Sequence, residues 1–225
     1  HFVYTMKQPK EFIKRKKQSK WHWNFWNKRM DPKMYKIVAN IQGKWPALPK
    51  VLKENTFLYS NPVALAQQNH FGVANTQNYV GLNLDKHTTK KYDKFIQATG
   101  LKNPVAYIHI QNPGQMTILH MDNARADNRH SDENGKVLTE SQRRARIGRL
   151  FIMLDDWHPG QVLLMGSEHF THWKKGDVMY FSWQDLPHGT ANFGHDSRPL
   201  LFVQGEITEE FKKLLANKKK KTIKV

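Results

Sequence analysis

Residues 104–122 read PVAYIHIQNPGQMTILHMD, and this stretch decides the fold class that we predict. Val105 to Ile110 form a short apolar run, Asn112-Pro113-Gly114 is a turn signal, and Gln115 to Asp122 form a second run. Short runs rich in β-branched and aromatic residues, separated by a turn, are typical of consecutive β-strands. The sequence therefore predicts that the β-rich part of the chain begins at Pro104.

Further short apolar runs lie beyond this stretch, at residues 150–154, 161–165, 178–183 and 200–203. Turn signals containing glycine separate them, and many short strands with such punctuation indicate a barrel, sandwich or jelly roll. A helix is expected near residues 91–99, ending at Gly100, and another is expected to open at Thr208, which can cap it. We therefore predict a mainly β fold with flanking helices.

The length of 225 residues favours one catalytic domain with decorations. We expect a basic, aromatic-rich N-terminal extension over residues 1–103 that packs on the core, and the core itself over residues 104–206. A C-terminal helix and a lysine-rich tail are expected over residues 207–225. Residues 123–146 are polar and charged, which predicts a long loop that can close over a substrate as a lid.

Composition narrows the chemistry. The chain has no cysteine, so any metal site must use histidine, aspartate or glutamate ligands. No apolar run is long enough to cross a bilayer, and the lysine-rich start lacks the apolar stretch of a secretory signal. From these features we expect no membrane span and an intracellular, cytoplasmic location.

The charge is strongly positive, with 36 basic and 19 acidic residues and a formal net charge of +17. Lysine-rich blocks lie at residues 14–17 and 218–221. Such a field favours a polyanionic or acidic partner or substrate, although a solvated terminal run explains the same residues about equally well.

Four polar residues in the β-rich part form a pattern with chemical meaning. His120 and Asp122 are two residues apart, and positions i and i+2 of a strand lie on the same face. Two histidines and one carboxylate on one face of an iron leave adjacent coordination positions open, and His188 would complete that set. A 2-oxo diacid that chelated the metal would need a cation for its far carboxylate. The guanidinium of Arg198 suits that role because its donors match a carboxylate in pairs.

With these residues, the range 104–206 resembles the double-stranded β-helix core of the 2-oxoglutarate and iron(II)-dependent oxygenase superfamily. The motif of that superfamily is H-x-D, a distal histidine and then an arginine, at the spacing of His120, Asp122, His188 and Arg198. The layout is similar to the prolyl-hydroxylase-like branch, with the subfamily unassigned. The resemblance implies a cupin-like jelly roll in which His120, Asp122 and His188 are the catalytic metal ligands.

The resemblance further implies an Fe(II) enzyme that uses 2-oxoglutarate and O2, with ascorbate as an accessory reductant. Such a dioxygenase hydroxylates a C–H bond of a protein, amino-acid or nucleic-acid substrate and releases succinate and CO2; desaturation and demethylation stay open. Candidates for further cosubstrate contacts are Tyr180, Gln161 and Asn192. Prolyl-hydroxylase-like members carry a tyrosine ligand for the cosubstrate on the strand matching residues 149–157. This sequence has none there, so that contact must differ.

Two other functions compete with this interpretation. A cupin-like metal-binding protein or isomerase would account for His188 and Asn192, which fit the H-x-x-x-N pattern of cupins, but not for Arg198. A nucleic-acid-binding module would use the terminal lysines and the aromatic cluster at residues 21–26. It explains the charge but not the histidines and the aspartate of the motif.

Overall fold

Two β-sheets face each other in the computed structural model of the chain, which describes residues 35–48, 90–120, 138–139, 142, 145–183, 185–217 and 219–225. The strands and helices are, in chain order, β1 (Tyr35–Gln42), α4 (Asp93–Gln97), β2 (Lys102–Gln111), β3 (Met116–His120), β4 (Ile147–Met153), β5 (Gln161–Met165), β6 (Glu168–Phe170), β7 (Asp177–Phe181), β8 (His188–Asn192), β9 (Arg198–Glu206), α6 (Glu209–Ala216) and β10 (Lys221–Lys224). In the described part of the chain, no helix is both long and apolar enough to cross a membrane.

The strand pairing has a nested order. β2 pairs with β9, β3 with β8, β4 with β7 and β5 with β6, each pair antiparallel. The larger sheet has the order β10-β1-β7-β4-β9-β2 and the smaller one β3-β8-β5-β6, so the nested pairs alternate between the two sheets until the closing β5–β6 hairpin. A long hairpin folded over in this way is a jelly roll, the double-stranded β-helix. The fold class predicted from the sequence is confirmed.

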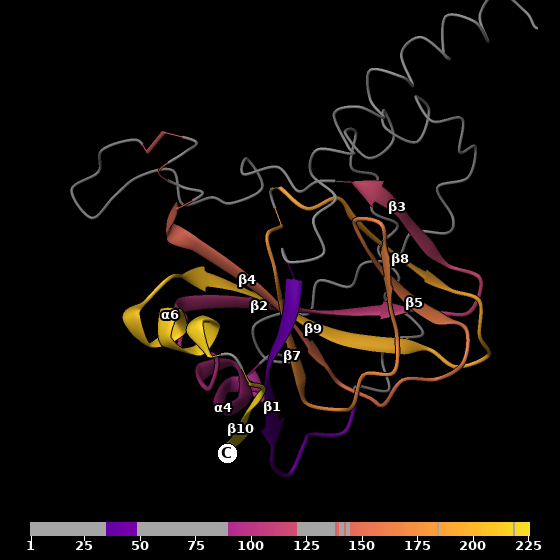
Figure 1. The fold of residues 1–225 in the computed structure, drawn as a ribbon. Helices are drawn as coiled ribbons and strands as arrows, with labels where there is room; N and C mark the ends of the chain where they lie inside the picture. The colour runs from indigo at the N-terminus through magenta and orange to yellow at the C-terminus, as the bar shows by residue number, and fades with distance from the viewer. Residues whose placement is uncertain are drawn as a thin grey trace, which may run out of the picture.

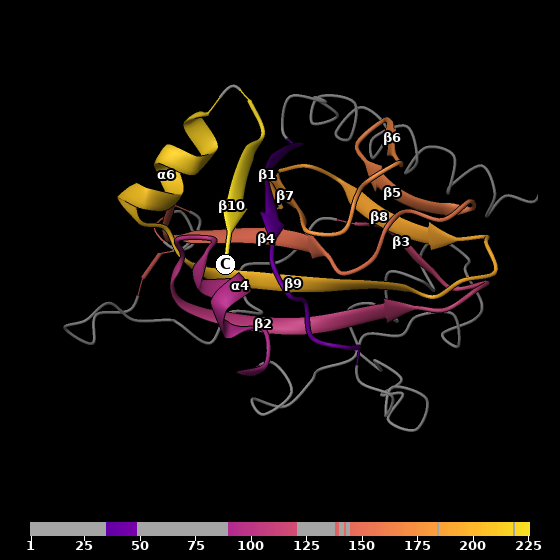
Figure 2. The same cartoon turned by 90° about the horizontal axis from the view of Figure 1, so that it is seen from below.

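The larger sheet is covered on both faces. One face of β4, β7 and β9 packs with β5 of the smaller sheet around a core that includes Met153, Leu163, Met165, Met179 and Phe181. The other face packs against the helices, whose buried side chains include Phe95 of α4 and Phe211 of α6. Figures 1 and 2 show α4 and α6 on one side of the larger sheet and β3, β5 and β8 on the other. We call the space between the two sheets the barrel interior.

Both helices begin or end as their sequences predict. Thr208 caps α6 because its Oγ1 accepts a hydrogen bond from the backbone nitrogen of Phe211 at 3.1 Å, and Glu209 and Glu210 lie in the first turn. The same hydroxyl donates to the carbonyl oxygen of Gly100 at 2.5 Å. Gly100 follows α4 with φ of 74°, a conformation in which glycine ends helices without strain. The cap of one helix is therefore tied to the end of the other.

The outer strands β1 and β10 differ from the sequence-based division of the chain. The range 1–103 was expected to pack on the core as an extension, but its residues Tyr35–Gln42 form β1 within the larger sheet. Residues Lys221–Lys224, expected in a lysine-rich tail, form β10, which runs parallel to β1. Lys220 forms an ion pair with the buried carboxylate of Asp177 at 2.5 Å. Strands β2 to β9 lie within Lys102–Glu206, close to the expected core.

Candidate active site

His188 begins β8 and is only 4% exposed in the barrel interior. Its Nδ1 lies 2.9 Å from the carbonyl oxygen of Leu186. Because a carbonyl oxygen can only accept, Nδ1 carries a proton, and in the neutral form of the ring Nε2 is then the nitrogen with the lone pair. The ring packs edge-on against Phe181, with centroids 4.7 Å apart. A backbone carbonyl that fixes the tautomer and ring orientation is the usual support of a metal-ligating histidine.

The strand register brings the two histidines of the motif together. His120 ends β3 and is the cross-strand partner of His188, after a register shift between Thr117 and His120. Residues directly opposite in an antiparallel pair have Cα atoms about 4.5–5.5 Å apart. The side chain of His120 and the whole of Asp122 lie outside the described residues, as does most of the predicted lid at 123–146. Among the described side chains, no group of three or more histidine, aspartate or glutamate residues is arranged to hold a metal.

Arg198 is the first residue of β9 and its side chain is a buried cation, 3% exposed. It shares its strand face with Leu200 and Phe202, which belong to the core of the barrel interior. Its Nη2 donates to Oε1 of Gln111 at 2.8 Å, whereas its Nε and Nη1 are buried and have no hydrogen-bond partner among the residues that the structure describes. Burial lowers the pKa of Arg198 well below its usual range, to about 9, because removal from water disfavours the charged form. The guanidinium is still a cation at neutral pH.

Gln111 is a site residue that we did not predict. It ends β2 and is the cross-strand partner of Arg198. Its Nε2 donates to Oγ1 of Thr190 at 2.8 Å, and Thr190 in turn donates through Oγ1 to the hydroxyl of Thr117 at 3.2 Å. We call the series Arg198, Gln111, Thr190 and Thr117 the polar chain. It connects β9 to β2, β8 and β3, the last two of which carry His188 and His120.

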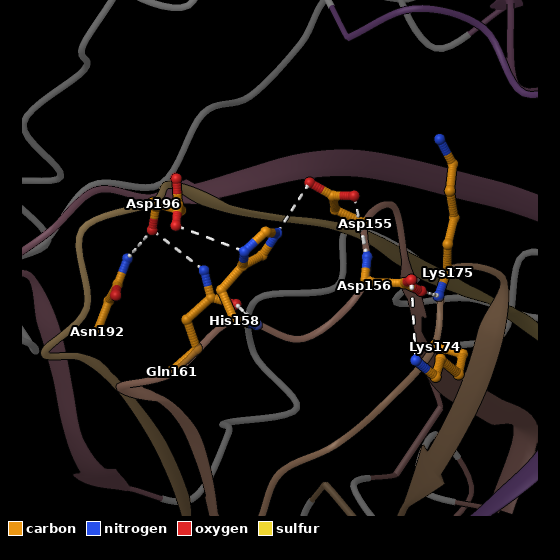
Figure 3. A network of polar contacts seen from close by, with 8 residues as sticks. All are labelled: Asp155, Asp156, His158, Gln161, Lys174, Lys175, Asn192 and Asp196. Carbon is orange, nitrogen blue, oxygen red and sulfur yellow. Dashed lines mark hydrogen bonds and ion pairs between the residues drawn. The ribbon is translucent and has the colours of Figure 1, made fainter.

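Gln161 and Asn192 lie close to Arg198 in the fold but act on the backbone. Nδ2 of Asn192 donates to the carbonyl oxygens of Asp196 at 2.8 Å and Gln111 at 2.9 Å. Nε2 of Gln161 donates to the same Asp196 carbonyl at 3.1 Å, as Figure 3 shows. Both amides therefore hold the turn at residues 193–197, which immediately precedes Arg198. The structure gives them a role in placing that arginine through the backbone.

A network of polar contacts at the surface holds the same turn. His158 lies between two carboxylates, with Nε2 3.6 Å from Asp155 and Nδ1 3.4 Å from Asp196 (Figure 3). Asp156 continues the network toward Lys174, at 3.9 Å. Because these side chains are substantially exposed, each contact contributes little free energy. The network links the β4–β5 connection to the turn before Arg198.

Tyr180, the remaining predicted cosubstrate residue, is not brought together with Arg198. Its ring packs edge-on against Phe211 of α6, with centroids 6.2 Å apart, on the helix side of the larger sheet. Burial raises the pKa of Tyr180, and the negative charge of Asp185 raises it further. Its strand neighbours Met179 and Phe181 are the residues of β7 that face the barrel interior.

No protein-family model and no curated protein matches the chain. Several solved structures are similar to parts of it. A Cupin 2 conserved barrel domain protein from Salinispora arenicola is 11% identical, with 51% of this chain and 71% of that chain covered and a TM-score of 0.30. A predicted oxalate decarboxylase from Thermotoga maritima is 13% identical, with 56% and 77% covered and a TM-score of 0.31. The non-haem monooxygenase ThoJ, in complex with nickel, is 12% identical, with 44% and 41% covered and a TM-score of 0.32. Likenesses this low assign neither a family nor an activity, and the strand pairing alone defines the fold.

Proposed function

We propose that the protein is a non-haem iron(II), 2-oxoglutarate-dependent dioxygenase that hydroxylates a C–H bond. The observation that supports this most directly is the guanidinium of Arg198, which is buried in the barrel interior with Nε and Nη1 unpartnered. A buried cation without a counterion is unfavourable, and an anionic ligand relieves it. The two competing functions, a cupin-like metal protein and a nucleic-acid-binding module, give this buried cation no role.

The residues of the motif supply the donor types that the implied metal and cosubstrate require. His120, Asp122 and His188 would hold the iron, and Arg198 would hold the far carboxylate of 2-oxoglutarate through paired, charge-assisted hydrogen bonds. Iron, 2-oxoglutarate and dioxygen supply the oxidation that turns a substrate C–H into C–OH, with release of succinate and CO2. A positively charged surface, with a net charge of +17, favours an acidic or polyanionic substrate.

The protein's own share of the reaction is binding, orientation and exclusion of water. The Leu186 carbonyl holds the Nδ1 proton of His188, so that Nε2 is presented as a ligand atom. The apolar neighbours of this ring, including Phe181 and Met165, are fully buried and keep bulk water from this part of the barrel interior. Charge–charge attraction at Arg198 is correspondingly stronger than it would be in water.

The test combines metal and cosubstrate binding without oxygen. Fe(II) and 2-oxoglutarate together should give a visible charge-transfer band in the wild-type protein, and admission of O2 should release succinate. In Arg198→Met, Fe(II) binding should persist while the affinity for 2-oxoglutarate falls. Truncation of one partner of a buried charge pair costs about 2–5 kcal/mol, which is about 30-fold or more in affinity. Lys213→Met, which removes the same charge from the exposed face of α6, is the matched control and should behave as wild type.

The outcomes separate the competing functions. Metal binding with no response to 2-oxoglutarate would favour the cupin-like metal protein. Loss of 2-oxoglutarate binding in both arginine and lysine variants would indicate a general effect of surface charge. In His188→Ala, Fe(II) binding itself should be lost, because one of the proposed ligands is removed. Undiminished metal binding there would contradict the ligand assignment.

A further inference from the structure

We propose that Gln111 is a positioning residue that orients Arg198 for an anionic ligand while leaving the positive charge of the guanidinium uncompensated. The inference rests on the proposed function for the identity of the ligand, 2-oxoglutarate, but not for the charge of the site. Nothing in the motif predicts it, because Gln111 precedes the H-x-D motif and belongs to a different strand.

The orientation of the Gln111 amide is determined by its partners. Arg198 has only donors, so the atom that faces its Nη2 at 2.8 Å must be the oxygen Oε1. The amide nitrogen is then directed to Thr190, where it meets Oγ1 at 2.8 Å. The reverse orientation would set two donors against each other at Arg198. Thr190 and Arg198 together therefore allow one orientation of the amide.

The backbone of Gln111 is held as well. Its carbonyl oxygen accepts from Nδ2 of Asn192 at 2.9 Å, and its strand position is paired with Arg198. The hydroxyl of Thr190 is anchored in turn by Thr117 at 3.2 Å. Side chain and main chain are thus each held by both β8 and β9, and Gln111 is a rigid acceptor. A rigid acceptor on Nη2 limits rotation of the guanidinium, which fixes the direction of Nε and Nη1.

The neutrality of the acceptor is the second part of the inference. A carboxylate of the same length at this position would form a buried ion pair with Arg198 and would compete with any anionic ligand. An amide oxygen accepts the same hydrogen bond without a full negative charge. Gln111 therefore orients the guanidinium of Arg198 without neutralising its charge. This suits a site that must bind and release a carboxylate.

The test uses Gln111→Glu and Gln111→Leu and measures stability without ligand separately from binding. Gln111→Glu should raise the midpoint of thermal unfolding of the metal-free and ligand-free protein, because the buried cation gains a counterion. The same substitution should weaken binding of 2-oxoglutarate to the Fe(II) protein about 30-fold or more. Gln111→Leu removes the acceptor without adding charge, so it should lower both stability and affinity, the latter about tenfold. Only Gln111→Glu is expected to change stability and affinity in opposite directions, raising the first and lowering the second.

Gln204→Glu is the matched control. Gln204 accepts through Oε1 from Nε of Arg149 at 2.9 Å, so the same substitution places a carboxylate beside a second buried arginine of the same sheet. The affinity of the Gln204→Glu variant for 2-oxoglutarate should stay at the wild-type value. Equal weakening by the two glutamate variants would overturn the assignment to Gln111.

Two further results would overturn the inference. One is an affinity of Gln111→Glu for 2-oxoglutarate that equals that of wild type, and the other is a ligand-free protein that Gln111→Glu destabilises. Failure of the proposed function has a different signature. If the wild-type Fe(II) protein binds no 2-oxoglutarate while Gln111→Glu raises ligand-free stability, the dioxygenase proposal fails and the uncompensated charge at Arg198 is supported.

Discussion

Replacement of Arg198 by methionine should make the ligand-free protein more stable. Burial lowers the pKa of the guanidinium to about 9, which corresponds to a cost on the order of 5 kcal/mol for the charged form in the folded protein. Methionine removes that cost and fills most of the same volume. It also leaves Oε1 of Gln111 without its donor, which costs about 2 kcal/mol. The net expectation is a free energy of unfolding about 3 kcal/mol higher than that of wild type.

The measurement is urea denaturation of the two proteins without iron and without 2-oxoglutarate, followed by circular dichroism at several pH values. At neutral pH the stability difference should be fully developed, because the folded arginine is charged below pH 9. Above about pH 9 the folded arginine loses its proton while the unfolded chain keeps it, so wild-type stability should rise relative to Arg198→Met and the difference should narrow. With Fe(II) present in both proteins, adding 2-oxoglutarate at a concentration that saturates wild type should stabilise wild type further and should stabilise the variant much less.

A ligand-free Arg198→Met protein that is less stable than wild type, by an amount independent of pH, would refute this reasoning. It would mean that the positive charge of Arg198 is already neutralised in the folded protein, so that an anionic ligand would gain little by binding there. Lys213→Met again serves as the control for loss of one positive charge, and its stability should change little because Lys213 is exposed.

Further predictions concern the surroundings of the site and the edge strand β10. Tyr180→Phe should leave the affinity for 2-oxoglutarate unchanged in a titration, because Tyr180 packs on the helix side of the sheet; a large loss would place its hydroxyl at the site after all. Gly160→Ala should lower the free energy of unfolding by about 2 kcal/mol or more, since a Cβ there would lie 2.4 Å from backbone of the facing turn at a φ of +90°. Gly114→Ala, which has positive φ and open space, should lose only about 1 kcal/mol in the same urea experiment. Asp177→Asn should speed amide hydrogen exchange in β10 by loss of the Lys220 ion pair, and unchanged exchange would show that the pairing with β1 suffices.

Six strands of the core, β2, β3, β4, β5, β7 and β9, could be predicted from sequence because each contains a short apolar run bounded by turn residues, whereas β6 and β8 contain no such run. The alternation of strands between two sheets could not, since it depends on pairings such as that of Val105 with Gln204 across the whole core. The motif residues His120 and His188 were identified by residue type, and their opposition across β3 and β8 is a matter of register. The predicted ligand Asp122 lies outside the described residues and stays a prediction.

The differences between the predicted site and the observed contacts have a common physical cause. β7 is buried on both faces, so its residues show no alternation of polar and apolar types from which the direction of Tyr180 could be predicted. Gln111 resembles any polar residue at the end of a strand until its pairing with Arg198 is known. Gln161 and Asn192 were predicted from residue type alone, and their amides are occupied by backbone carbonyls.

The C-terminal lysines were misjudged for a similar reason. A run of lysines predicts a solvated tail, but Ile223 packs on the helix-side core and Lys220 meets the carboxylate of Asp177, which is 4% exposed. The ion pair of Lys220 and the packing of Ile223 are tertiary contacts. Such contacts depend on the fold and cannot be predicted from the composition of the segment.

The nested pairing of the strands has a consequence for the order of folding. The β5–β6 hairpin joins residues close in sequence, whereas Gln111 and Arg198 are 87 residues apart and belong to the outermost pair. Local hairpins form quickly, and closure of long loops is slow. We expect the hairpin to act as a nucleus from which pairing spreads outward, so that the arginine and glutamine meet in the last step. Recovery of anion binding during refolding would then lag behind recovery of strand content. The slowest kinetic phase would correspond to formation of the binding site.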